Sequence, residues 1–186
     1  MTMVHAQMGA PAPAVAPGTA VEPSKALDDL LKLFEDEVVG VAKAMPADKY
    51  SFTPVAATFA AGSPAKFDTV KSFSQQVTHT AVANYYFYSA VGGMKPDVDM
   101  AALQKMTNDP KVSKEEALKM LIGSLAFAHK AIAAITPANA FLAIKPIDGQ
   151  NTRASLAAFG VAHGYDHYGQ MVEYLRMNGI VPPGSK

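Results

Sequence analysis

Four long segments of this chain repeat apolar residues at steps of three and four, and this period constrains the fold more than any other feature. They cover residues 24–44, 67–91, 113–136 and 152–178, with a short extra turn over 100–106. No stretch shows the convincing alternation of apolar and polar residues that marks a half-buried strand. The sequence therefore predicts an all-α fold, a four-helix bundle.

Helix start and stop signals support these segments. Ser24 is the predicted N-cap of the first helix, and Ser113 followed by Glu116 forms a capping box at the third. Gly179 follows the last helix as its C′ residue, and Asp148-Gly149 marks a turn in the loop before that helix. The connections before the second helix and after the third are long, so a non-sequential crossover is compatible with the pattern.

The N-terminal residues differ in composition from the rest of the chain. Residues 1–23 are rich in Ala and Pro without a helical period, and they are predicted to form a flexible tail before a bundle domain at 24–186. Val4-His5-Ala6 before Gln7 resembles the end of an export-signal cleavage site, so cytoplasmic and exported locations both stay open. No apolar run reaches the length of about 18 residues that a membrane span requires.

Charge and cysteine content exclude several classes of function. Sixteen basic residues balance sixteen acidic ones, and no Lys/Arg run is present, which argues against a nucleic-acid-binding protein. The chain has no cysteine, so thiolate zinc sites, disulfides and cysteine nucleophiles are excluded.

The last helix carries the strongest sign of chemistry. His163 and His167 are four residues apart, hence about 6 Å along the helix axis and about 40° around it, which lets two imidazoles converge on one ion. A pair of satisfied core or surface histidines is the alternative, because this spacing also arises by chance. His79, in the middle of the second helix, is the predicted third ligand, and His129 on the third helix is its competitor.

An aspartate, two tyrosines and three glycines near these histidines also have predicted roles. Asp166 is predicted to orient a ligand imidazole or to act as a base, with a solvated surface position as the alternative. One of Tyr85 and Tyr86 is expected to line a pocket above the ion. The glycines of the last helix are expected to allow close helix approach around the site; they are Gly160, Gly164 and Gly169.

These residues carry a resemblance to a known family. The segment from His163 through His167 to Pro183, together with His79 to Tyr86, resembles the DinB-like (YfiT-like) metalloproteins. The resemblance covers residues 24–183 and implies that His79, His163 and His167 bind one divalent ion, nickel or zinc. It gives His129 no counterpart. The absence of Trp departs from many relatives and leaves the lining of the pocket undefined.

The resemblance also bears on activity. Three imidazoles with a free fourth position are typical of a catalytic rather than a structural metal site. Relatives that act with small thiols, such as bacillithiol or mycothiol, imply a metal-dependent S-transferase with a small-molecule substrate. A metal-dependent hydrolase and a non-catalytic metal-containing protein are the alternatives. A homodimer is a further expectation, with Phe87 as an aromatic residue at an outer position.

Overall fold

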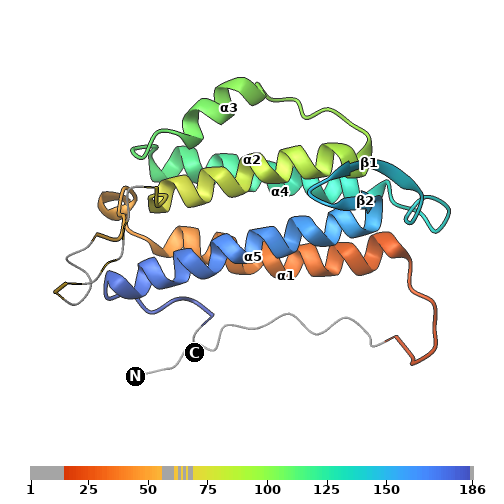
Figure 1. Ribbon diagram of the computed structural model, residues 1–186. Helices are drawn as coiled ribbons and strands as arrows, with labels where there is room; N and C mark the ends of the chain where they lie inside the picture. The colour runs from red at the N-terminus through yellow and green to blue at the C-terminus, as the bar shows by residue number, and fades with distance from the viewer. Residues whose placement is uncertain (1–14, 56–60, 63, 65, 67–68, 185–186) are drawn as a thin grey trace.

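The computed structural model describes residues 15–55, 61, 62, 64, 66 and 69–184, and within them four long helices enclose the core (Figure 1). The long helices are α1 (Pro23–Ala44), α2 (Phe73–Gly92), α4 (Lys114–Ala133) and α5 (Arg153–Met177). The shorter elements are η1 (Ala47–Lys49), α3 (Met100–Thr107), β1 (Ala143–Ile147) and β2 (Gln150–Thr152). The predicted all-α bundle is confirmed.

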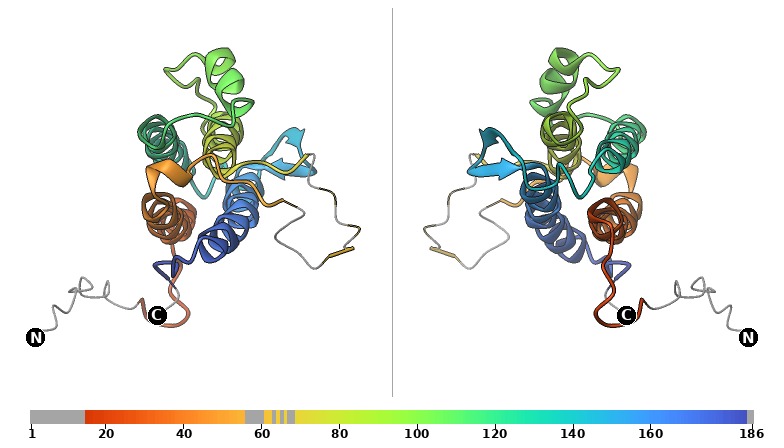
Figure 2. Two further views of the ribbon diagram at one scale, coloured as in Figure 1. Left: turned by 90° about the vertical axis from the view of Figure 1, so that its left-hand side faces the viewer. Right: turned by 90° about the vertical axis from the view of Figure 1, so that its right-hand side faces the viewer.

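The order of the helices around the core is not their order along the chain. The neighbouring pairs are α1–α4, α4–α2, α2–α5 and α5–α1, so the consecutive long helices α1 and α2 lie diagonally opposite (Figure 2). Helices α1 and α5 run in one direction, and α2 and α4 run in the other (Figure 1). The long connection through α3 lets α2 and α4 run in the same direction, because α3 runs back along the outside of α2.

Most predicted helix ends are confirmed, and two are corrected. The Ser113–Glu116 capping box is present, and Gly179 has the positive φ of 73° expected beyond a helix C-terminus. The first helix begins at Pro23, since the N-cap is Glu22 and not Ser24. The second begins at Phe73, well after the predicted start near residue 67, because Ser72 and Gln75 form a capping box there.

The loop predicted over 138–150 contains a small antiparallel hairpin. Strands β1 and β2 are joined at Asp148-Gly149, where both residues have positive φ, 46° and 78°. Such a two-residue turn is the one that tightly connected antiparallel strands favour. The strands are too short to show an alternating pattern in sequence, so only the turn was predicted.

The core consists of apolar side chains from all four long helices. Among the fully buried ones are Leu31 and Phe34 of α1, Phe73 and Tyr88 of α2, Leu121 and Leu125 of α4, and Leu156 and Met171 of α5. Buried polar groups in this core find partners: the Tyr88 hydroxyl donates to the Ala157 carbonyl at 3.0 Å, and Asn84 Nδ2 donates to Ser124 Oγ at 3.1 Å. No buried side-chain nitrogen or oxygen among the described residues lacks a hydrogen-bond partner.

The predicted role of the glycines in α5 is confirmed at two positions and wrong at the third. A Cβ at Gly160 would lie 3.0 Å from the Tyr88 hydroxyl, and one at Gly164 would lie 2.8 Å from Cε1 of Phe34. Both glycines therefore allow a ring to pack directly on the α5 backbone. Gly169 has open space where a Cβ would be, so close packing does not explain it.

Two further points concern membrane-spanning helices and the N-terminal residues. None of the described helices combines the length and the hydrophobicity needed to cross a membrane. The proposed cleavage site at Val4–Gln7 lies outside the described residues.

Candidate metal centre

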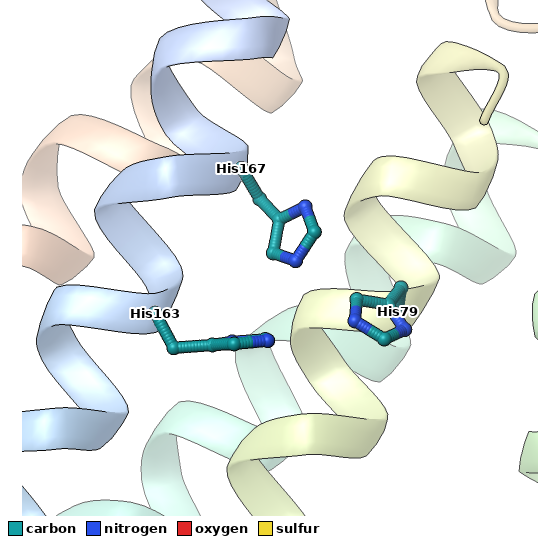
Figure 3. A group of neighbouring side chains, drawn as sticks. All are labelled: His79, His163 and His167. Atoms are coloured by element: carbon teal, nitrogen blue, oxygen red, sulfur yellow. The ribbon is translucent and has the colours of Figure 1, made fainter. Parts of the chain in front are cut away.

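Three histidines from two helices meet on the side of the bundle where α2 faces α5 (Figure 3). His163 and His167 stand one turn apart on α5, with ring centroids 4.7 Å apart. His79 on α2 lies opposite them, 5.4 Å from the His163 ring and 4.6 Å from the His167 ring. The predicted third histidine is therefore the one that the fold brings to the pair.

The donor set of this cluster fits a divalent ion. Each imidazole offers one nitrogen, and the three nitrogens all lie within 4.8 Å of one another. A single ion with metal–nitrogen bonds of about 2.1 Å holds such nitrogens about 3.4 Å apart, a spacing inside the 4.8 Å limit of this cluster. Within the described parts of the chain, this is the one group of at least three His, Asp or Glu side chains that could hold a metal.

The protonation state of the cluster favours metal binding. Burial lowers the pKa of His79 to about 4, and repulsion from the Lys71 ammonium group and from a protonated His163 ring adds to this effect. Burial likewise lowers the pKa of His167 to about 4, with repulsion from the other two imidazoles. Burial also lowers the pKa of His163, against the opposing carboxylates of Asp166 and Asp148. The imidazoles are therefore neutral at pH 7, the state in which histidine binds metals.

A chain of hydrogen bonds orients the most buried ligand. His167 Nδ1 lies 2.7 Å from Gln76 Oε1, Gln76 Nε2 lies 2.7 Å from Gln170 Oε1, and Gln170 Nε2 lies 3.1 Å from Asp166 Oδ2. An ionised carboxylate only accepts hydrogen bonds, so Asp166 fixes which end of each amide faces which neighbour. The proton of His167 is thereby held on Nδ1.

The consequence for His167 is that Nε2 is the free nitrogen. Figure 3 shows this nitrogen pointing into the space between His79 and His163. A partner on the second ring nitrogen is the usual means by which proteins fix the tautomer and orientation of a metal-binding histidine.

Asp166 thus contacts the site indirectly. Its side chain is exposed, and its hydrogen bond comes from Gln170 and not from an imidazole. The position is consistent with an orienting role through two amides. Its role as a catalytic base stays a prediction.

Aromatic rings support His163 from the side. The Phe87 ring packs edge-on against it at a centroid distance of 5.3 Å, and Phe159 lies 6.3 Å away. Phe87 is only 3% exposed. The prediction that Phe87 lies at an outer position and could form a dimer contact is therefore wrong, because α2 turns this ring toward α5.

Two cavities adjoin the histidines. One, of about 350 Å³, lies beside His79 and Lys71; the other, of about 300 Å³, lies beside His79 and His163. Tyr86 lines the second cavity, so of the two tyrosines considered it is the one beside the candidate metal centre. Tyr85 lines a separate cavity between α2, α3 and α4.

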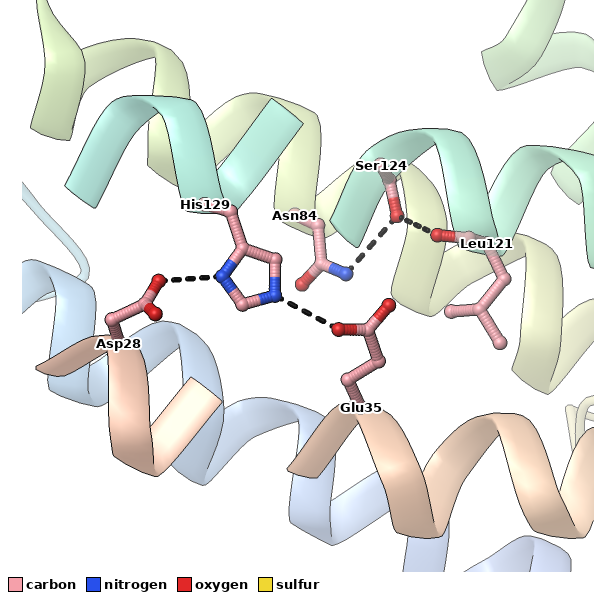
Figure 4. Close-up of polar contacts among 6 residues, drawn as sticks. All are labelled: Asp28, Glu35, Asn84, Leu121, Ser124 and His129. Carbon is pink, nitrogen blue, oxygen red and sulfur yellow. Dashed lines mark hydrogen bonds and ion pairs between the residues drawn. The ribbon is translucent and has the colours of Figure 1, made fainter. Parts of the chain in front are cut away.

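His129 belongs to a different cluster, as Figure 4 shows. Its Nδ1 lies 2.5 Å from Asp28 Oδ1 and its Nε2 lies 2.8 Å from Glu35 Oε2, so this ring joins α4 to α1. Both ring nitrogens are engaged with different carboxylates. His129 is therefore excluded as a ligand of the triad, in agreement with its missing counterpart in the family pattern.

Sequence reasoning missed three residues beside the site. Gln76 and Lys71 gave no local signal, since a glutamine next to a helix start and a lysine before it are ordinary surface residues in most proteins. The sequence identifies Asp148 only as a turn residue, yet it lines the cavity beside His163. Only the packing of the hairpin against α5 places it there.

The chain was compared with models of known families. A family model described as DinB superfamily matches residues 30–171, a range that contains the three histidines, Gln76 and Asp166. No curated protein matches the chain.

Proposed function

We propose that this chain, which belongs to the DinB superfamily, binds one divalent metal ion through His79, His163 and His167 and transfers a small thiol to an electrophile. Nickel and zinc are the ions we expect. The observation that carries the proposal is the convergence of three neutral imidazoles beside two cavities. A three-histidine set leaves a coordination position open, as in catalytic rather than structural sites.

The ion, when bound, would supply Lewis acidity that lowers the pKa of a thiol or a water molecule. The protein supplies orientation. Gln76 holds a proton on Nδ1 of His167, and Phe87 holds the ring of His163 from the side. Both contacts fix ligand rings before substrate arrives, and this limits reorganisation during the reaction.

The remaining chemistry is a displacement at the electrophile. A sulfur–carbon bond forms, the bond to the leaving group breaks, and the thiol proton must leave the site. Asp148 lines the cavity beside His163, so its carboxylate is better placed than that of Asp166 to accept this proton. The small-thiol assignment rests on the family resemblance, and hydrolysis with water in place of the thiol uses the same residues.

The first experiment measures metal content in purified, tag-free protein reconstituted with nickel or zinc. We expect about one ion per chain, lost in His79→Ala, His163→Ala and His167→Ala and kept in His129→Ala. His129→Ala is the matched control because it removes an imidazole from a different helix pair. Absence of bound metal in the wild-type protein would overturn the proposal.

A second experiment separates the reactions. The loaded protein is assayed with a small thiol and a chromogenic aryl halide, and separately with a chromogenic ester without thiol. Conjugation that requires both thiol and metal supports the S-transferase. Thiol-independent ester cleavage would replace it with a hydrolase, and a metal-loaded protein inactive in both assays would indicate a binding role.

A further inference from the structure

The two cavities beside the histidines are neighbours along α2 and α3, and together they are named the groove. The first is bordered by Lys71 just before α2, by Gln75 in the first turn of α2 and by Thr107 at the end of α3. The second is bordered by residues further along α2 and by Met100 at the start of α3. His79 and Gln104 line both, so the two cavities adjoin beside the candidate metal centre.

The end of the groove at Lys71 is polar and positively charged. Lys71 is the one charged side chain among the described residues that line it, and none of those residues carries a carboxylate. Lys71 and His79 line the same cavity of about 350 Å³, so one small molecule can contact both the ammonium group and an imidazole of the triad.

The opposite end of the groove is mainly apolar. Val82, Phe87 and Met100 line it together with the ring of Tyr86. The charged group there is Asp148, next to His163. An anion is therefore favoured at Lys71 and disfavoured at the Asp148 end, which gives a bound molecule one preferred direction.

We infer that this groove selects a small organic carboxylate with an apolar substituent, binding the carboxylate at Lys71 and the apolar part against Phe87 and Met100. The inference rests on the proposed function, since it places the centre of the molecule over His79. A single lysine matches the one negative charge of a carboxylate. Phosphate is usually met by several cationic groups or by an arginine fork, and neither lines this cavity.

The test uses isothermal titration of the metal-loaded full chain with hexanoate, hexan-1-ol and inorganic phosphate. We expect hexanoate to bind at least about tenfold more tightly than hexan-1-ol, because only the carboxylate gains a charge-assisted hydrogen bond. Lys71→Met should remove this preference, and Lys71→Arg should retain it. Met100→Gln should weaken hexanoate binding while leaving the preference for the carboxylate.

Lys105→Met is the matched control. Lys105 is exposed on α3 and lines neither cavity, so its removal tests whether any nearby positive charge suffices. We expect hexanoate affinity within about twofold of wild type, since exposed charges are screened by salt. Equal effects of Lys71→Met and Lys105→Met would overturn the inference, as would tighter binding of phosphate than of hexanoate.

Metal content measured on the same samples separates this inference from the proposed function. If Lys71→Met keeps its metal and binds hexanoate like wild type, the groove assignment is wrong and the metal centre stands. If wild-type protein holds no metal but still shows hexanoate binding that depends on Lys71, the proposed function is wrong and the groove assignment stands.

Discussion

Replacing Gln76 by leucine tests how the buried ligand His167 is held. Gln76 is 1% exposed, and its side-chain oxygen is the acceptor for His167 Nδ1 at 2.7 Å. In Gln76→Leu, either the buried Nδ1–H has no acceptor or the proton moves to Nε2, the nitrogen needed for the metal. Leaving a buried donor unpaired costs about 1–3 kcal/mol, which corresponds to a roughly 5- to 150-fold loss of metal affinity.

That range includes the loss of about 10- to 100-fold that is typical when the partner of a metal-binding histidine is removed. Metal affinity is measured by competition with a chelating dye at fixed pH, and nitrogen NMR of the metal-free protein reports which nitrogen of His167 carries the proton. Gln76→Glu is the matched variant, because a carboxylate still accepts from Nδ1 and should preserve binding. Unfolding curves establish that each variant is folded.

The result that would refute this reasoning is a folded Gln76→Leu protein whose metal affinity is unchanged. A His167 ring protonated on Nε2 in the wild-type protein would refute it as well, since the polarity set by Asp166 requires the proton on Nδ1.

Three further predictions concern pH and packing. Because the pKa values of His79 and His167 are lowered to about 4, metal affinity measured by dye competition should stay nearly constant from about pH 8 to about pH 6, where ordinary imidazoles would lose it. Burial alone would lower the pKa of His129, but hydrogen bonds and attraction from the carboxylates of Asp28 and Glu35 raise it. The interaction of His129 with these carboxylates therefore stabilises the folded state fully below the usual imidazole pKa of 6.5, and this stabilisation is lost as pH rises through the raised pKa. His129→Gln should therefore reduce unfolding free energy by about 1 kcal/mol at low pH and by much less at high pH; an equal loss at both would contradict this. In urea unfolding, Gly169→Ala should raise the free energy of unfolding by about 0.5–1 kcal/mol, since the added Cβ meets open space. Gly164→Ala should lower it by about 1–2 kcal/mol, because the added Cβ would press on the fully buried ring of Phe34.

The sequence by itself determined the features that depend on neighbouring residues. The spacing of apolar residues predicts the long helices because one helical turn brings residues three and four apart onto the same face. The capping box at Ser113 and the pair His163–His167 depend on the same local geometry. These predictions are confirmed because they need only the regular geometry of one helix.

The second helix shows where this local reasoning weakens. Its residues are buried on several faces, since α4, α5 and α3 all pack against it. The apolar stripe is therefore broad and does not mark a sharp beginning, and the sequence predicts a start that is too early. Only the capping contacts of Ser72 and Gln75 define it.

The tertiary structure alone decided which distant residues meet. His79 joins His163, and Gln76 reaches His167, across more than 80 residues of sequence. His129 meets Asp28 and Glu35 across a comparable separation, which excludes it from the metal centre. Such contacts depend on the order, direction and relative rotation of packed helices, and no local sequence pattern records these quantities.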